Sequence, residues 1–226
     1  GIPCQVVMPR TAPQAKLDAV RGYGAAVTLC EPTLTARKAT LDDIIKKTGA
    51  EFVHPYNDPR VIAGQGTCAK ELIEKVGPID AVIAPIGGGG MISGTSLTCS
   101  VISRDTTVYA GEPAQADDAC RSLHAGHIIA DDAPVTIADG LRVSLEPYTW
   151  HFVSTYVRDI LTVSEDEIAA AMQLIWKRMK IVVETSSAVA FAAVIKNKPL
   201  FAGKRTGVIL TGGNVDFNKL PWLKKP

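Results

Sequence analysis

Four consecutive glycines, residues 87–90, lie between an apolar run and a segment with helical periodicity. Residues 81–84 (Ala-Val-Ile-Ala) have the pattern of a buried strand, and apolar residues recur at helical intervals from 91 to 103. The glycines therefore occupy a strand-to-helix turn, where backbone N–H groups and the helix dipole favour an anion. We predict that this loop binds a phosphate group and is more than a flexible linker.

The composition indicates a globular protein of balanced charge. Of 226 residues 46% are hydrophobic, and 24 Lys and Arg stand against 23 Asp and Glu. This length suits one large domain, or a domain and a half, with an ample core. Because no long run of one sign occurs, we expect no nucleic acid partner.

The cysteines and the hydropathy indicate the compartment. Five cysteines are scattered along the chain, several of them within apolar runs, as is typical of buried thiols in a reducing environment. The sequence contains no recognisable signal peptide and no apolar run long enough to span a bilayer. We therefore expect a cytoplasmic protein with no membrane partner.

Strand and helix signals alternate along the chain. Apolar runs predict strands at 5–8, 25–30, 51–54, 81–84, 107–110 and 207–210. Helical patterns lie at 12–23, 34–47, 67–76, 91–103 and 188–195. Ser164 and Glu167 form a capping box before a further helix with Ile168, Met172, Ile175 and Met179 on one face. This alternation predicts an α/β fold with parallel strands in two lobes, divided near residues 55–59.

Two common nucleotide motifs fit the glycines poorly. A dinucleotide-binding loop needs glycines at offsets of two and five, and residues 91, 92 and 93 break that pattern. Glu112 lies about twenty residues on, like a ribose-binding acid, so NAD stays an alternative. A Walker A loop needs a lysine that residues 94–96 lack, so we expect no nucleoside triphosphate here.

Six motifs together give a more specific indication. They are Gly64-Gln65-Gly66-Thr67, residues 85–91, Glu112-Pro113, residues 136–140 (Thr-Ile-Ala-Asp-Gly), Glu184, and residues 210–214 (Leu-Thr-Gly-Gly-Asn). In this order and spacing the chain resembles pyridoxal-phosphate enzymes of the serine racemase and threonine dehydratase type, from its first residues to Asn214. The resemblance implies the fold of tryptophan synthase β subunits, a two-lobed, three-layer α/β architecture with parallel sheets and the cofactor in the cleft between the lobes.

The resemblance also implies the domains and the cofactor site. Residues 1–54 would be part of the small domain, and residues 55–226 most of a large cofactor-binding domain whose N-terminal part is missing. Backbone amides of Gly87, Gly88, Gly89, Gly90 and Met91 would hold the phosphate of pyridoxal 5'-phosphate. Thr211 would hydrogen-bond the pyridine nitrogen, and Gly140 and Glu184 would line the cofactor. The family usually has proline after this glutamate, where the chain has Thr185. An ordinary threonine at a strand end is the alternative for Thr211.

A hydroxyl opposite the pyridine nitrogen has a chemical consequence. It cannot keep that nitrogen protonated as an aspartate would, so the ring is a weaker electron sink. The resemblance implies a serine racemase or dehydratase acting on L-serine, with L-threonine as a second substrate. Proton abstraction at Cα would lead to β-elimination, giving a keto acid and ammonia, or to reprotonation, giving the D-amino acid. A non-catalytic relative and a nicotinamide-dependent oxidoreductase are the alternatives.

The segment after residue 111 offers oxygen ligands. In the serine racemase branch the corresponding positions bind a divalent cation through the carboxylates of Glu112 and Asp118 and the carbonyl of Ala116. Magnesium or calcium suits such an all-oxygen site. Alternatively, Asp117 or Asp118 is the N-cap of the following helix. The four histidines show no ligand spacing, and we interpret them as structural or surface residues.

No catalytic residue is assigned within the chain. In the family a lysine of a Ser-Phe-Lys type motif forms the Schiff base, and residues 1–226 contain no such motif. The chain also opens at Gly1 without a methionine, close to a core strand. We therefore expect a part of a longer enzyme, inactive by itself, which forms a homodimer at full length and takes a small amino-acid substrate. A naturally short relative with a regulatory role is the alternative.

Overall fold

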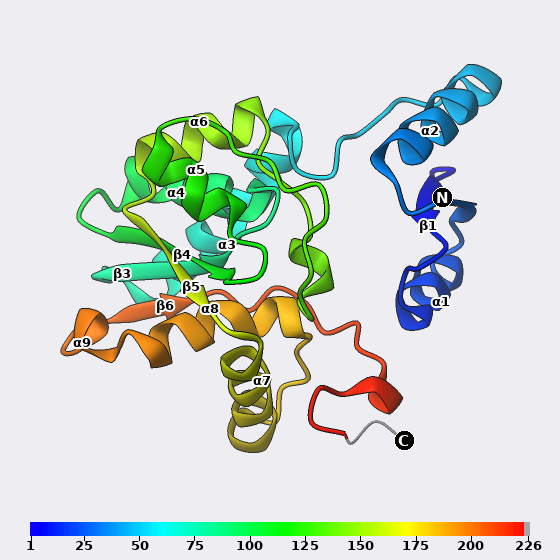
Figure 1. Ribbon diagram of the computed structural model, residues 1–226. Helices are drawn as coiled ribbons and strands as arrows, with labels where there is room; N and C mark the ends of the chain where they lie inside the picture. The colour runs from blue at the N-terminus through cyan, green and yellow to red at the C-terminus, as the bar shows by residue number, and fades with distance from the viewer. Residues whose placement is uncertain (224–226) are drawn as a thin grey trace. The chain divides into compact units, whose positions relative to one another are not determined.

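The computed structural model describes residues 1–223, which fold as two units that adjoin in sequence at Val53 and His54 (Figure 1). One unit comprises Gly1–Val53 with the described residues after Gly213, and the other comprises His54–Gly213. The sequence-based division places residues 55–226 together, of which 224–226 lie outside the described residues. The division into functional domains stays a prediction.

The first unit contains a small parallel sheet. Strands β1 (Gln5–Pro9) and β2 (Ala26–Cys30) pair from Gln5 opposite Ala26 to Pro9 opposite Cys30. Helix α1 (Gln14–Gly22) connects them, and α2 (Leu34–Thr48) follows. Gly49, two residues after the predicted helix at 34–47, ends α2 in the left-handed conformation, at φ 68°. A short 3-10 helix, η2 (Phe217–Lys219), also belongs to this unit.

The strand predicted at residues 51–54 is wrong. These residues form neither strand nor helix, and the side chains of Phe52 and Val53 are 43% and 54% exposed. A run of four residues is stable as a strand only when it joins a ladder, and the described part of this unit pairs β1 with β2 alone. The sequence pattern showed that these residues are apolar, but it could not show that the described residues offer them no strand to pair with.

The second unit is built on a four-stranded parallel sheet in the order β5-β4-β3-β6. Its strands are β3 (Ala81–Pro85), β4 (Thr107–Pro113), β5 (Asp159–Val163) and β6 (Thr206–Val208). Strand β3 is buried throughout, as expected for a central parallel strand covered on both faces. In register, Ala81 lies opposite both Thr107 and Thr206.

Helices cover both faces of this sheet, which confirms the predicted three-layer α/β fold (Figure 1). Helix α8 (Thr185–Lys196) packs against β3, β4 and β5 on one face. On the other face α4 (Gly90–Ile102) packs on β3 and β4, and α5 (Asp118–Ala125) on β5. The remaining helices are α3 (Pro59–Val76), α6 (Pro147–Tyr156), α7 (Glu165–Met179), α9 (Lys198–Phe201) and the 3-10 helix η1 (Asp139–Leu141).

Helix α3 begins eight residues earlier than predicted. Asp58 caps it by accepting the Arg60 N–H at 2.8 Å, and Pro59 occupies the first helical position. The prediction failed because Gly64 and Gly66 are typical of a loop in sequence. At Gly66 the reason is that α3 crosses α4 closely: a Cβ there would stand 2.7 Å from Thr98 Oγ1 and 3.0 Å from the Gly94 carbonyl oxygen, whereas a Cβ on Gly64 would meet nothing within 4 Å.

The capping box at the start of α7 is confirmed. Ser164 Oγ accepts the Glu167 N–H at 3.3 Å, and Glu167 Oε2 accepts the Ser164 N–H at 2.8 Å. Ile168, Met172 and Ile175 are buried as predicted, whereas Met179 at the helix end is 54% exposed. Helix α6 and strand β5 were not predicted, because they lie in or beside a region without clear periodicity.

Candidate functional site

The four glycines form the turn from β3 into α4. Gly90 is the first residue of α4, and Gly89 is its N-cap with φ 86°, a conformation that favours glycine. No side chain caps this helix start, although residues 88–90 are buried. The first N–H groups of a helix have no partner within the helix. A buried, uncapped helix start of this kind is suited to an anion.

Neighbouring segments exclude a side chain at each glycine of the loop. A Cβ on Gly87 would lie 2.8 Å from Leu141 Cα, and one on Gly88 would lie 2.6 Å from the Tyr56 ring. At Gly89 a Cβ would meet Leu145 Cδ2 at 2.7 Å, and at Gly90 it would meet Tyr56 Cβ at 2.8 Å. The loop therefore offers backbone groups and no side-chain atoms of its own until Met91. This cradle fits a phosphate group.

The Glu146 carboxylate holds residues 54–57, and Tyr56 of this segment lies against the glycine loop. Its carboxylate accepts from the Asn57 amide at 3.0 Å and from Tyr56 Oη at 3.5 Å, and it lies 3.3 Å from His54 Nε2. His54 Nδ1 accepts the Asn57 N–H at 2.9 Å, which places the imidazole proton of neutral His54 on Nε2, facing Glu146. Sequence reasoning missed Tyr56 and Glu146. The only signal for Tyr56 was a polar and aromatic stretch before Pro59, and Glu146 stands directly before Pro147 at the start of α6.

Gly140 and Thr211 are both held at the start of α8. The Gly140 N–H donates to Ser186 Oγ at 3.0 Å, and the Thr211 N–H donates to Ser187 Oγ at 2.9 Å. Glu184, the N-cap of α8, donates its own N–H to the Gly212 carbonyl oxygen at 2.9 Å. A Cβ on Gly212 would stand 2.9 Å from Glu184 Oε1, so the carboxyl group lies beside the segment that carries Thr211.

The structure thus gathers all eight predicted cofactor residues at one end of the sheet. The glycine loop follows β3, Thr211 follows β6, and Leu141, which touches Gly87, is the neighbour of Gly140. The carboxyl ends of parallel strands are where α/β proteins bind their ligands. The individual contacts of these residues with a cofactor stay predictions.

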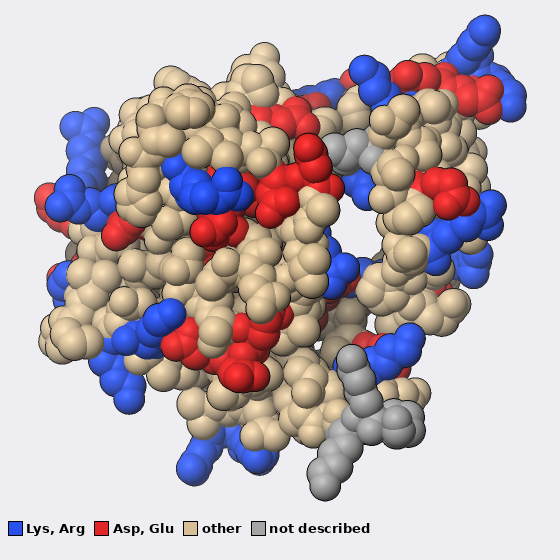
Figure 2. Space-filling view, viewed as in Figure 1, with Lys and Arg blue, Asp and Glu red and all other residues tan. Residues whose placement is uncertain are grey.

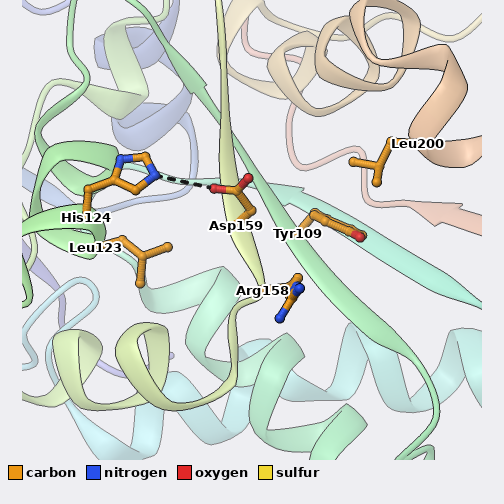
Figure 3. A pocket seen from close by; sticks show the side chains of 6 residues that line it. All are labelled: Tyr109, Leu123, His124, Arg158, Asp159 and Leu200. Atoms are coloured by element: carbon orange, nitrogen blue, oxygen red, sulfur yellow. Dashed lines mark ion pairs between the residues drawn. The ribbon is translucent and has the colours of Figure 1, made fainter.

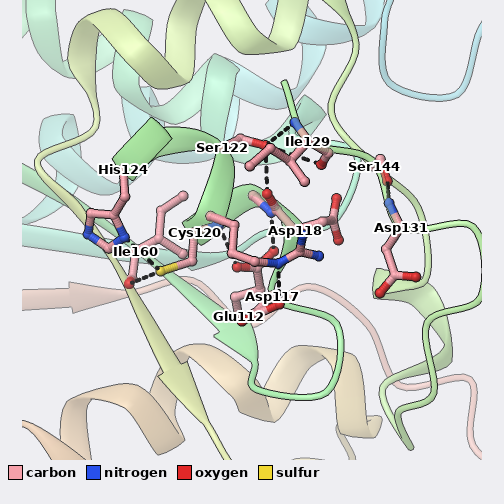
Figure 4. A network of polar contacts seen from close by, with 12 residues as sticks. Glu112, Asp117, Asp118, Cys120, Ser122, His124, Ile129, Asp131, Ser144 and Ile160 are labelled. Carbon is pink, nitrogen blue, oxygen red and sulfur yellow. Dashed lines mark hydrogen bonds and ion pairs between the residues drawn. The ribbon is translucent and has the colours of Figure 1, made fainter. Parts of the chain in front are cut away.

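Glu112 lies near the end of β4, with its carboxylate turned to the start of α5 (Figure 4). It is 1% exposed, and its two oxygens accept the N–H groups of Ala119 and Cys120 at 2.9 and 2.8 Å. Burial raises the pKa of Glu112 to about 8, although both hydrogen bonds act in the opposite direction. Glu112 therefore caps α5, whereas Asp117, at the N-cap position, makes no side-chain cap and pairs with Arg121 at 2.7 Å.

Asp118 is also buried, at 2% exposure, and its Oδ2 atom has no hydrogen-bond partner. Burial raises the pKa of Asp118, against a hydrogen bond to Ser144 that lowers it. Among the described residues no group of three or more His, Cys, Asp or Glu side chains is arranged to hold a metal. The predicted set contains two carboxylates and one carbonyl, so its metal binding stays a prediction.

A separate cavity of about 480 Å³ lies elsewhere in this unit (Figure 3). Tyr109, Leu123, His124, Arg158, Asp159 and Leu200 line it. His124 Nε2 lies 3.9 Å from Asp159 Oδ1, and Asp159 is the first residue of β5. None of the predicted cofactor or metal residues lines this cavity.

The surface charge and the helices relate to the expectations about nucleic-acid and membrane partners. Figure 2 shows acidic and basic side chains interspersed over the face in view. Within residues 1–223 no helix is both long enough and apolar enough to cross a membrane. The expectations about partners stay predictions.

Residues 1–212 match the family model described as "Pyridoxal-phosphate dependent enzyme". The chain belongs to this family. It is 64% identical to β-hydroxyaspartate dehydratase from Paracoccus denitrificans, over 98% of the chain and 70% of that protein. The crystal structure of serine racemase from Dictyostelium discoideum superposes with a TM-score of 0.88 at 43% identity, over 96% of the chain and 70% of that structure. The crystal structure of a T.th. threonine deaminase gives a TM-score of 0.88 at 39% identity, over 96% and 71%.

Family membership confirms the resemblance to serine racemases and serine/threonine dehydratases and the tryptophan synthase β-like fold. It implies pyridoxal phosphate as the cofactor and supports an enzyme. The relatives have different substrates in their names, so membership by itself leaves the substrate open.

Proposed function

We propose that the protein catalyses pyridoxal-phosphate-dependent removal of water from a β-hydroxy-α-amino acid, as an ammonia-lyase with a racemase side reaction. The gathering of the glycine loop, Gly140, Glu184 and Thr211 at one end of the parallel sheet carries this proposal. The resemblance in sequence favours L-serine, with L-threonine second. The 64% identity to a β-hydroxyaspartate dehydratase favours 3-hydroxyaspartate as the first substrate to test.

The chain's own residues have distinct roles in this proposal. Amides of Gly87 to Gly90 and Met91 hold the phosphate, and Gly140 and Glu184 border the ring. The Thr211 side chain is exposed in the structure and is free to face the pyridine nitrogen with a neutral hydroxyl. When bound, the cofactor withdraws electrons from the substrate Cα, which makes the proton there removable. A neutral partner for the ring nitrogen limits that withdrawal and favours elimination and proton exchange.

The lysine that binds the cofactor is proposed to lie outside residues 1–226. Lys16 is in α1, Lys70 is in α3 and Lys180 caps the end of α7, and none of them lies in a Ser-Phe-Lys type motif. Residues 1–226 alone are then expected to release no ammonia, whereas the complete protein is active. A complete protein that lacks such a lysine would instead favour a non-catalytic relative.

Ammonia release by the complete protein tests the substrate. We expect kcat/KM to be higher by about tenfold or more for 3-hydroxyaspartate than for L-serine and L-threonine. Only 3-hydroxyaspartate carries a second carboxylate, and a site that pairs with this group discriminates strongly against substrates that lack it. A preference for L-serine would favour the serine racemase and dehydratase interpretation. A protein that stays colourless with added cofactor and releases no ammonia from any of the three would contradict the proposed function.

We further propose that Glu112, Asp118 and the Ala116 carbonyl bind Mg²⁺ or Ca²⁺. Two observations support this. Both carboxylates are buried, so a cation would offset the cost of their charge, and Asp118 Oδ2 lacks a partner. The donor atoms are all oxygens, which suits these hard cations.

Replacing Asp118 by alanine is expected to abolish stabilisation by Mg²⁺. For the unaltered protein, Mg²⁺ at a hundredfold excess over Kd should add about 2.7 kcal/mol to the free energy of unfolding. Thermal melts with and without MgCl₂ measure the corresponding rise in Tm. Asp117→Ala is the matched control, since Asp117 pairs with Arg121 at the surface and should leave the rise intact. An undiminished rise in the Asp118 variant would favour a purely structural role in α5.

A homodimer at full length and a cytoplasmic location are also part of this proposal. The five cysteines are all free in the structure, which supports a reducing compartment.

A further inference from the structure

Helix α8 begins with three hydroxyl side chains in a row, Thr185, Ser186 and Ser187. They are 9%, 3% and 0% exposed. Each one holds a different polar group of the site: Thr185 Oγ1 donates to the Ile137 carbonyl oxygen at 2.8 Å, while Ser186 and Ser187 accept the N–H groups of Gly140 and Thr211. The first turn of α8 therefore joins two chain segments that are remote from it in sequence.

Thr211 needs such an anchor because it lies beyond the sheet. Strand β6 ends at Val208, and the last backbone bond to β3 runs from the Ile209 N–H to the Ile83 carbonyl oxygen at 2.9 Å. The Thr211 N–H, two residues further on, instead donates to Ser187 Oγ. The Ser187 hydroxyl is thus the hydrogen-bond partner of the Thr211 N–H, while the next residue, Gly212, is held through its carbonyl oxygen by the Glu184 N–H.

We propose that Ser187 is a positioning residue for the cofactor. It holds the Thr211 backbone so that the Thr211 hydroxyl meets the pyridine nitrogen. Ser186 similarly holds Gly140 beside the cofactor ring by accepting the Gly140 N–H. This inference rests on the proposed function, because it assigns Thr211 to the ring nitrogen. Ser187 touches neither substrate nor cofactor in this role and acts through Thr211.

The test compares Ser187→Ala with the unaltered complete protein. The substitution deletes one oxygen, and alanine is the best helix former, so the helix itself is retained. With its acceptor gone, the Thr211 N–H is left unpaired, and we expect the dissociation constant of pyridoxal phosphate to rise about tenfold. Tryptophan fluorescence quenching measures this constant. The visible absorption band of the bound cofactor should also shift, since its position reports the partner of the ring nitrogen, and amide hydrogen exchange at residues 209–213 should accelerate without cofactor.

Ser96→Ala is the matched control. Ser96 is 1% exposed, and its hydroxyl donates to the Ser93 carbonyl oxygen of the same helix at 3.1 Å, so its loss should leave the cofactor constant and band unchanged. An unchanged constant and band in Ser187→Ala would overturn the inference while the proposed function stands. Equal effects in both variants would overturn it too, because generic loss of packing would then suffice. If the unaltered complete protein binds no pyridoxal phosphate, the inference falls together with the proposed function.

Discussion

Replacing Gly89 by alanine is expected to weaken binding of pyridoxal phosphate about 100-fold, equivalent to about 2.7 kcal/mol. Two costs combine at this position. The backbone has φ 86°, where an L side chain costs about 1–2 kcal/mol. The new Cβ would also stand 2.7 Å from Leu145 Cδ2 and 2.9 Å from Thr149 Cβ. Relief of these contacts moves the amides that hold the phosphate, and a cofactor titration measures the loss.

Gly24→Ala separates the two costs. Gly24 has the same φ of 86°, but nothing lies within 4 Å of the Cβ it would gain. This variant should lose about 1–2 kcal/mol of stability and bind the cofactor normally. If Gly89→Ala bound the cofactor as tightly as Gly24→Ala does, the loop would not be the phosphate site.

Replacing Gly94 by alanine is expected to lower the free energy of unfolding of the second unit by about 3 kcal/mol, near the upper end for overpacking. A Cβ on Gly94 would overlap the Gly66 nitrogen and the Ile62 carbonyl oxygen, which belong to the backbone of α3 and cannot rotate away. Helix propensity favours alanine by about 1 kcal/mol, which is too little to offset this clash. Urea denaturation followed by circular dichroism measures the change.

Gly64→Ala in α3 is the control for this prediction. Gly64 is exposed, and a Cβ there would meet nothing within 4 Å. The variant should gain roughly 0.5–1 kcal/mol from helix propensity alone. A stabilised Gly94→Ala protein would show that α3 and α4 are not as close as their glycines indicate.

Most elements of the fold were predictable because their signals are local. The apolar run of β3, the capping box at Ser164 and the C-cap at Gly49 each specify an element within a few residues. The predictions that failed concern elements that depend on contacts between residues far apart in the sequence. Residues 51–54 lack a partner strand among the described residues, and Gly66 of α3 is explained only by the approach of α4.

The candidate site divides in the same way. The glycine loop, Gly140, Glu184 and Thr211 were predictable as motifs, and the structure brings them together at one end of the sheet. The residues that hold them in place were not predictable. Tyr56, which lies against the glycine loop, donates to the Glu146 carboxylate 90 residues further along the chain. Ser187 accepts the Thr211 N–H, 24 residues away. Such partners follow from packing, which no short motif encodes.

A crystal structure of the complete protein with pyridoxal phosphate tests the central claim most directly. We predict that the phosphate oxygens accept hydrogen bonds of about 3 Å from the backbone N–H groups of residues 87–91, with the Thr211 hydroxyl at the pyridine nitrogen. A phosphate bound elsewhere, for instance beside Arg158 in the separate cavity, with the glycine loop free of ligand, would contradict the account.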